Sequence, residues 1–236
     1  MTIFFLFTFV EAIQLYNTGN KYYAENNFQS AIECYENALK LCKNKDIYYN
    51  LGNAYFKSGK IGKAIIQYRK AYLLCPRDED ISYNLNFLRN FRPDRTTNIP
   101  NPFFQFLDQF FHYFSLKESG ILSSITFLFI AIFLSLYLIN HNKLFLWVSI
   151  IGSLFFIYFL IISILWQAEK NSNSAVVVVD ELKAYSGPGE EYKEILIIHD
   201  GTEAKIREER NGYYLVQLPG GIGGWVKTDG IERIFE

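Results

Sequence analysis

Residues 51–76 read LGNAYFKSGKIGKAIIQYRKAYLLCP, and this stretch decides how the first third of the chain folds. Its small and aromatic positions have counterparts 33 residues earlier: Gly52, Tyr55, Ala64, Tyr68 and Ala71 repeat Gly19, Tyr22, Ala31, Tyr35 and Ala38. Five identities in one register indicate a repeated helical hairpin. Glycine and alanine let antiparallel helices approach closely, and the tyrosines fill the gaps between neighbouring hairpins. Such an array presents a concave surface to a partner and brings no catalytic apparatus of its own.

The pattern places one helical hairpin over residues 12–43 and a second over residues 45–76, with tight turns at 26–27 and 58–60. A partial third unit follows, because Tyr83-Asn84-Leu85 repeats Tyr49-Asn50-Leu51 with a shift of 34. A helix over residues 79–90 is predicted to cap the last hydrophobic face of the array. The repeat domain, capping helix included, is therefore expected over residues 12–92.

The motif of Leu51, Gly52 and Tyr55, followed by Ala64, Tyr68, Ala71 and Pro76, resembles a tetratricopeptide repeat, and the first unit departs from it at Thr18 and Lys43. The resemblance implies that helix residues around each glycine line a peptide-binding groove: Tyr16, Asn20, Tyr23, Tyr49, Asn53, Phe56 and Lys57. An asparagine amide offers donors and an acceptor to an extended backbone. The alternative is that these residues are ordinary solvated surface.

Two further stretches are free of Asp, Glu, Lys and Arg, residues 119–142 and 144–168, with Lys143 between them. Each exceeds the roughly 20 residues that span a hydrocarbon core. The sequence therefore predicts two transmembrane helices over residues 119–168, joined by a very short turn. Neither contains an ionisable group that a transport pathway would need, so transport is not expected.

Two segments outside the predicted spans are also apolar. Residues 3–10 suit the core of a secretory signal, so residues 1–11 are interpreted as a signal segment, although the basic residues that usually precede one are lacking. The first part of a buried helix and a mis-assigned start are the alternatives. Prolines mark a linker after residue 93, and Phe103, Leu107, Phe110 and Phe114 recur at helical spacing. We interpret residues 93–118 as this linker and an amphipathic helix in the headgroup region, with a docking face for a partner helix as the alternative.

Short alternating runs separated by glycine turns fill residues 171–236 and predict a small all-β barrel. Strands are expected over 176–179, 195–198, 204–206, 213–217 and 225–227. The turn Ser186-Gly187-Pro188-Gly189 and the later Gly224-Trp225-Val226 resemble the bacterial SH3-like domain, with Tyr185 where an arginine is common. The resemblance implies a binding or spacing unit, and its candidate surface is Tyr185, Tyr192, Tyr214 and Trp225, with a core position for Trp225 as the alternative.

Composition excludes several functions. A formal net charge of −1 lacks the basic face that nucleic acid requires. Cys34, Cys42 and Cys75 form no CxxC pair, so no metal or cofactor is expected. No recognisable nucleophile accompanies His199, so the protein is not expected to be an enzyme. A redox sensor built on the three cysteines is the alternative.

The order of these parts resembles the E-type component of the Bat aerotolerance operon of Gram-negative bacteria. The resemblance implies a bacterial inner-membrane protein with periplasmic soluble domains, von Willebrand A-domain membrane proteins as partners, and a role in aerotolerance or envelope stress. The residues themselves favour a membrane-tethered scaffold that recruits protein partners through the repeat groove. The alternative is a cell-wall-binding protein, in which the SH3-like domain holds peptidoglycan and the repeats are a spacer.

Overall fold

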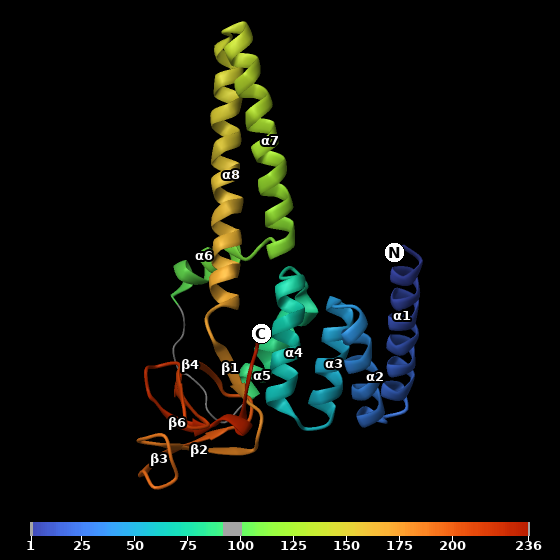
Figure 1. Cartoon of the computed structure of the whole chain (residues 1–236), viewed down its shortest axis with the longest axis vertical. Helices are drawn as coiled ribbons and strands as arrows, with labels where there is room; N and C mark the ends of the chain where they lie inside the picture. The colour runs from blue at the N-terminus through green and yellow to red at the C-terminus, as the bar shows by residue number, and fades with distance from the viewer. Residues whose placement is uncertain (1, 92–100, 236) are drawn as a thin grey trace. The chain divides into compact units, whose positions relative to one another are not determined.

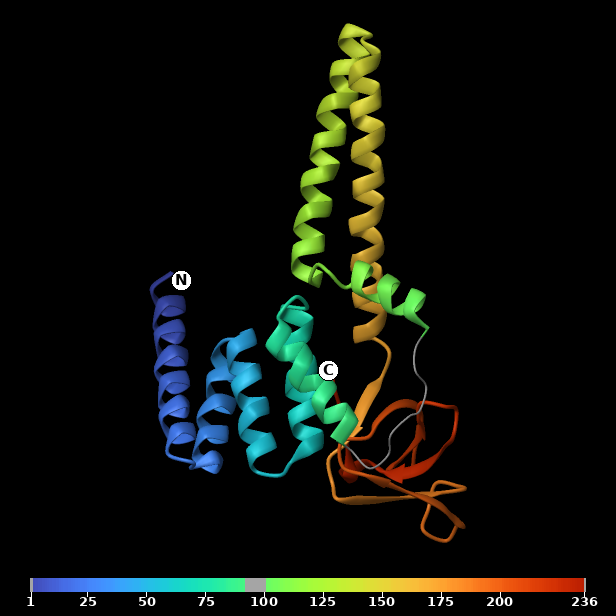
Figure 2. The same ribbon diagram turned by 180° about the vertical axis from the view of Figure 1, so that it is seen from behind.

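The computed structural model describes residues 2–91 and 101–235, and side chains are described for all of these except 2–6, 91 and 105. The chain divides into two compact units. Residues 1–99 and 170–236 form the first unit, which holds the repeat helices and the β domain. Residues 100–169 form the second, a helical unit. The predicted fold class is confirmed in its three parts: repeat hairpins, two long apolar helices and a C-terminal antiparallel sheet (Figures 1 and 2).

The repeat hairpins are α1 (Thr2–Ala24) with α2 (Phe28–Leu41), and α3 (Lys45–Lys57) with α4 (Ile61–Leu74). The close approach inferred from the glycines is confirmed. A Cβ on Gly19 would lie 2.6 Å from the Tyr35 ring, and a Cβ on Gly52 would lie 2.7 Å from the Tyr68 ring. Both turns need a left-handed backbone, at Asn26 with φ 59° and at Gly59 with φ 77°.

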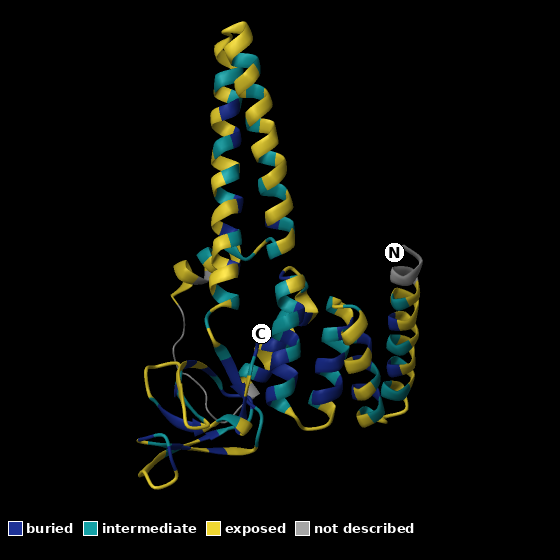
Figure 3. Cartoon of the chain, in the orientation of Figure 1, coloured by how far each residue is buried: buried dark blue, intermediate teal, exposed yellow. Residues whose placement is uncertain are grey.

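Helix α1 is continuous from Thr2, so the segment interpreted as a signal lies within the first repeat helix and is not set apart by a break. The end of the array is covered more fully than expected. Helix α5 (Glu79–Phe91) packs on α4 as the predicted cap, but the β domain packs on α4 as well. Val176 and Ile234 belong to the same buried core as the repeat residues. Figure 3 shows buried residues in dark blue along the repeat helices and in the β domain.

The seven strands form one antiparallel sheet in the order β3-β2-β6-β5-β4-β1-β7. They are β1 (Ser174–Val177), β2 (Glu181–Tyr185), β3 (Glu194–His199), β4 (Glu203–Arg210), β5 (Tyr213–Gln217), β6 (Gly223–Lys227) and, after the short helix η1 (Thr228–Gly230), β7 (Ile231–Arg233). A tight turn at Asn211-Gly212, with φ 51° and 77°, joins β4 to β5 as a hairpin. Strands β2 and β7 are absent from the sequence prediction. Strand β2 does alternate, with Leu182 and Ala184 buried, and it ends at the Ser186–Gly189 turn, whereas β7 has only 3 residues.

Polar contacts join the β domain to the repeats. The Asp200 carboxylate accepts hydrogen bonds from the backbone amides of Ile61 (2.8 Å) and Gly62 (2.9 Å), and so caps the N-terminus of α4, where Lys60 provides no side-chain cap. Burial raises the pKa of Asp200, against the lowering effect of these amides. Arg89 of α5 donates two hydrogen bonds to Glu203 of β4, at 2.7 and 3.0 Å. These two contacts, together with the shared core, define what we call the junction.

In the second unit, α7 (Leu116–Asn140) and α8 (Lys143–Lys170) lie side by side as an antiparallel hairpin (Figure 1). Both are long and apolar enough to cross a membrane, and in their most apolar windows 0% of α7 and 22% of α8 is buried. A hydrogen bond between Ser119 Oγ and Ser163 Oγ (2.9 Å) ties the two helices together.

Helix α6 (Pro102–Phe111) is docked on the C-terminal half of α8. Tyr158 donates to the Phe110 carbonyl (2.9 Å), and the buried Trp166 indole donates to the Phe114 carbonyl (2.8 Å). His112 lies against Asp108 (2.9 Å) and Glu169 (3.6 Å). Burial lowers the pKa of His112, but the bonds to these carboxylates outweigh it and raise the pKa to about 10. The exposed face of α6 carries Phe103, Phe104, Phe106 and Phe110.

Candidate functional site

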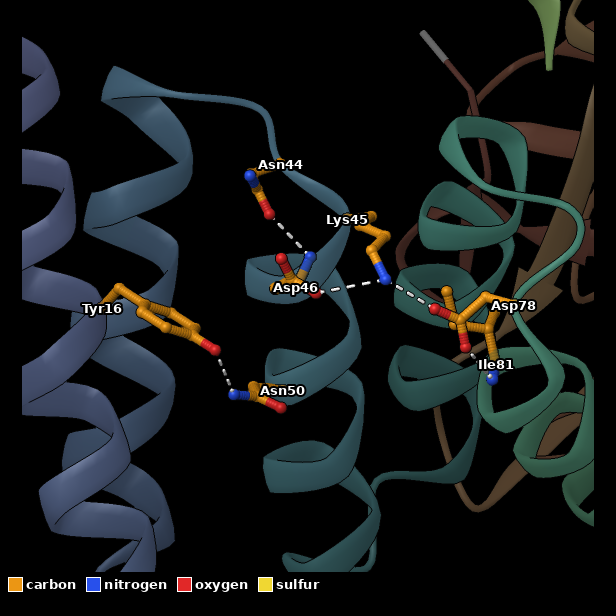
Figure 4. A network of polar contacts seen from close by, with 7 residues as sticks. All are labelled: Tyr16, Asn44, Lys45, Asp46, Asn50, Asp78 and Ile81. Carbon is orange, nitrogen blue, oxygen red and sulfur yellow. Dashed lines mark hydrogen bonds and ion pairs between the residues drawn. The ribbon is translucent and has the colours of Figure 1, made fainter.

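A ladder of asparagine and tyrosine side chains crosses the first helices of successive hairpins. In its first layer, the Asn20 Oδ1 atom accepts hydrogen bonds from the Tyr35 hydroxyl (2.7 Å) and from Asn50 Nδ2 (3.0 Å). Asn50 Nδ2 also donates to the Tyr16 hydroxyl at 3.0 Å (Figure 4). Burial raises the pKa of Tyr35, so the hydroxyl stays protonated and keeps its donor role.

The second layer repeats the first, one hairpin further along. Asn53 Oδ1 accepts from the Tyr68 hydroxyl (2.6 Å) and from Asn84 Nδ2 (3.3 Å), and Asn84 Nδ2 donates to the Tyr49 hydroxyl (3.0 Å). Neither Asn50 nor Asn84 was predicted as a site residue. The repeat of Tyr49-Asn50-Leu51 at Tyr83-Asn84-Leu85 was the available signal, because it places equivalent amides on α3 and α5.

Asn20 and Asn53 are therefore structural members of the array as well as candidate ligand contacts, and they are not ordinary solvated surface. Both carbonyl oxygens already accept two hydrogen bonds each. Their Nδ2 groups make no hydrogen bond within residues 2–91 and 101–235. The ladder consequently presents donors and suits a ligand rich in acceptors, such as the carbonyl groups of an extended peptide.

Four of the seven predicted groove residues, Tyr23, Asn53, Phe56 and Lys57, line one cavity of about 160 Å³. Residues that the sequence did not predict complete it: Tyr68, Asn84, Phe87 and Leu88. Phe56 and Phe87 meet edge to face, with ring centroids 6.0 Å apart. Tyr16 lines a separate cavity of about 270 Å³ between α1 and α3. Tyr49 and Asn20 lie in the ladder and line neither cavity.

The start of α3 is fixed by its own polar network (Figure 4). Asn44 Oδ1 accepts from the Asp46 amide (2.7 Å), and Lys45 Nζ lies 2.6 Å from Asp78 and 3.4 Å from Asp46. The hydrogen bond with Asp78 raises the pKa of Lys45. Because Asp78 also accepts from the Ile81 amide (3.3 Å), this network holds α5 in register with α3.

The four residues predicted as an exposed patch of the β domain do not share one surface. Tyr185 pairs with Trp225 across β2 and β6, so these two share a face. Tyr214 lies on the opposite face, against the core of the sheet and under Arg233. Tyr192 covers Gly187, where a Cβ would lie 2.4 Å from its ring.

Trp225 is only 9% exposed, in agreement with the core alternative. The Arg210 guanidinium lies 5.8 Å from its ring centroid. Tyr213, which was not predicted, meets Tyr185 edge to face at 6.4 Å. We call Tyr185, Tyr213, Arg210 and Trp225 the outer aromatic face.

No group of three or more His, Cys, Asp or Glu side chains suited to hold a metal ion occurs in the described part of the chain. The three cysteines are free thiols of intermediate exposure. Burial raises the pKa of the Cys34 thiol, which opposes formation of the reactive thiolate.

Comparison with known proteins agrees with the helical hairpins. Residues 19–59 match the family model described as TPR repeat, and residues 46–78 match the model described as tetratricopeptide repeat. No curated protein matches the chain.

Among solved structures, the first TPR of Spaghetti (RPAP3) bound to the HSP90 peptide SRMEEVD is 19% identical. That match covers 34% of this chain and 92% of the other, with a TM-score of 0.24. The C. elegans SMG5-SMG7 complex is 16% identical and covers 70% of this chain and 47% of the other, with a TM-score of 0.35. Tetratricopeptide repeats are generally non-catalytic and mediate protein–protein interaction. The matched residues, 19–78 taken together, identify the first part of this chain as tetratricopeptide repeats.

Proposed function

We propose that the protein is a membrane-tethered scaffold that recruits protein partners through its repeat groove. The observation that carries the proposal is the ladder, in which the same geometry occurs in two layers. In each layer the asparagine Oδ1 already accepts two hydrogen bonds, and the Nδ2 donors of Asn20 and Asn53 remain for a ligand. Beside the second layer, the cavity adds Tyr23, Phe56 and the Lys57 ammonium. Lys57 makes no ion pair with any described residue, so its charge is available to a carboxylate.

The membrane part of the proposal rests on the exposed apolar helices α7 and α8 and on the phenylalanine face of α6. Because α6 is held on α8 by side-chain hydrogen bonds, its exposed rings lie beside the spanning helices, where they suit the headgroup region. The Bat-operon resemblance adds an inner-membrane location with periplasmic soluble domains. It also adds von Willebrand A-domain partners and a role in aerotolerance or envelope stress.

The experiment is co-purification of partners from native membranes in mild detergent. Asn20 and Asn53 are unsuitable to mutate first, because their loss would also leave buried tyrosine hydroxyls without partners. Lys57→Glu reverses a charge at the cavity wall, and Lys43→Glu, an exposed lysine between the two hairpins, is the matched control. We expect Lys57→Glu to lose defined partners and Lys43→Glu to keep them. Equal retention by both variants would reject the groove as the recruitment site.

The wall-binding alternative is favoured by one observation, the outer aromatic face with Arg210 over Trp225. Half-buried aromatic rings beside a cation suit the ring faces and polar groups of a wall polymer. Sedimentation of the full chain with purified peptidoglycan, compared with Tyr213→Ala, tests it. Wall binding that depends on Tyr213 would make the repeats a spacer, and failure to sediment would remove this alternative.

A further inference from the structure

A third cavity, of about 400 Å³, lies at the junction between α4 and the β domain, apart from the repeat groove. Its floor comes from three adjacent strands. Lys205 of β4 pairs with Ser174 of β1 on one side and with Gln217 of β5 on the other, so the three side chains share a face. The walls are Arg69 of α4 and the turn from Leu218 to Gly221. Arg69 is seven residues after Gly62 and therefore lies two turns further along the side of α4 that meets β1.

A break in strand pairing adds a second cation to the floor. The register of β4 against β5 shifts between Ile206 and Glu208, which leaves Arg207 without a paired position. Bulges of this kind redirect a side chain. Here the Arg207 Nε atom donates to Gln217 Oε1 at 2.8 Å, which holds the guanidinium beside Lys205 in the cavity.

The polar groups that line the cavity are mainly donors. Gln217 uses its oxygen to accept from Arg207, and its Nε2 makes no hydrogen bond with described residues. Glu203 is the one carboxylate among the described lining residues, and Arg89 binds both of its oxygens from outside the cavity. Lys205 makes no ion pair with any residue in 2–91 or 101–235.

Lys205 and Arg207 therefore line the cavity without an ion pair to any described residue, beside Arg69 and a Glu203 carboxylate that Arg89 already binds. A surplus of at least two positive charges matches a dianion better than a single carboxylate, and a phosphate monoester carries about −1.5 to −2 at pH 7. Guanidinium groups bind phosphate oxygens in pairs. A volume of about 400 Å³ exceeds what a phosphate alone fills, so it leaves room for the organic part of an ester.

We propose that this junction cavity binds a phosphate group, either free or carried by a small phosphomonoester. Such a ligand would contact α4 and the sheet together and would stabilise the junction by mass action, because it would bind only the docked arrangement. This site is independent of the repeat groove, and it stands whether or not the groove recruits a peptide.

The test uses the full chain in detergent and a phosphate-free buffer. Binding of inorganic phosphate and of glycerol 3-phosphate is measured by calorimetry and by thermal shift, against chloride at the same ionic strength. The variant Lys205→Gln with Arg207→Gln removes two cations from an exposed strand face. Lys193→Gln, an exposed lysine with no ion pair among described residues, is the control.

We expect saturable binding by the wild type, weakened at least about tenfold in the double variant and unchanged in the control. Stronger binding of glycerol 3-phosphate than of phosphate would identify an ester as the ligand class, and equal binding would identify the free ion. Wild-type binding no greater than in chloride would overturn the proposal, as would equal binding by the double variant. If the double variant melts differently without ligand, Lys205→Gln alone is compared in its place.

Discussion

The contact between Gly62 and Val177 makes the junction sensitive to a single methyl group. A Cβ added at Gly62 would lie 2.0 Å from the Val177 carbonyl oxygen and 2.6 Å from the Asp200 carboxylate, whereas ordinary contact begins at 3.4 Å. The Val177 oxygen belongs to backbone and accepts from the Gly201 amide (3.0 Å), so it cannot turn aside as a side chain would. Gly62→Ala must therefore separate α4 from β1 by more than about 1 Å.

Such a separation would cost more free energy than the helix gains from the higher helix propensity of alanine. The hydrogen bonds from the Ile61 and Gly62 amides to Asp200, at 2.8 and 2.9 Å, would pass beyond bonding distance. Loss of an N-cap costs roughly 0.5–2 kcal/mol, and an overpacked contact roughly 1–3 kcal/mol. Replacing glycine with alanine stabilises a helix by about 0.5–1 kcal/mol through its higher helix propensity. We expect a net destabilisation of the junction by about 1–3 kcal/mol.

The assay is hydrogen exchange of the full chain in detergent, read at the start of α4 and along β1. Gly62→Ala should accelerate exchange at Ile61, Gly62 and Val177 by about 10- to 100-fold, while the α1–α2 hairpin keeps its protection. Gly120→Ala is the matched control, because its Cβ would meet nothing within 4 Å and the residue is also helical. Unchanged exchange in Gly62→Ala would refute the reasoning, since it would mean that α4 and β1 are not in contact.

Three further predictions concern the ladder and α6. Asn53→Ala should lower the free energy of unfolding by about 1–3 kcal/mol in chemical denaturation, because the Tyr68 hydroxyl loses its acceptor, and Tyr68→Phe in that background should add little. Gly52→Ala should destabilise by about 1–3 kcal/mol despite better helix propensity, since the Tyr68 ring lies 2.7 Å from the new Cβ, and a stable variant would contradict this packing. The pKa of His112, raised to about 10, lies above its ordinary value, so its contribution to docking of α6 is full below pH about 6.5 and is lost as pH rises through about 10. Because the His112 ring lies 4.6 Å from the Trp166 ring, the fluorescence difference between wild type and His112→Gln should change in that window, and a change near pH 6.5 instead would show that the carboxylates do not hold the proton.

Local patterns were sufficient for the helices. The glycine, alanine and tyrosine register predicted both hairpins because helix packing depends on side-chain size at fixed spacing, and Gly19 and Gly52 confirm it directly. Charge-free runs predicted α7 and α8 because a hydrocarbon core excludes ionised groups. The outward or inward direction of individual groove side chains was not predictable to the same degree. Whether Asn20 contacts a ligand or a neighbouring helix depends on Asn50, which lies 30 residues away.

The sequence by itself determined the order and type of the parts: repeat hairpins, two apolar helices and a small β domain. Only the tertiary structure decided that the β domain packs on α4 instead of standing apart. That contact joins Asp200 to Ile61 across 139 residues, and no periodic pattern encodes such a pairing. The contact needs a glycine on α4, a carboxylate far away in the sequence, and a backbone fold that brings the two together. The junction cavity exists for the same reason, because its cations come from α4 and β4 and meet only in the folded chain.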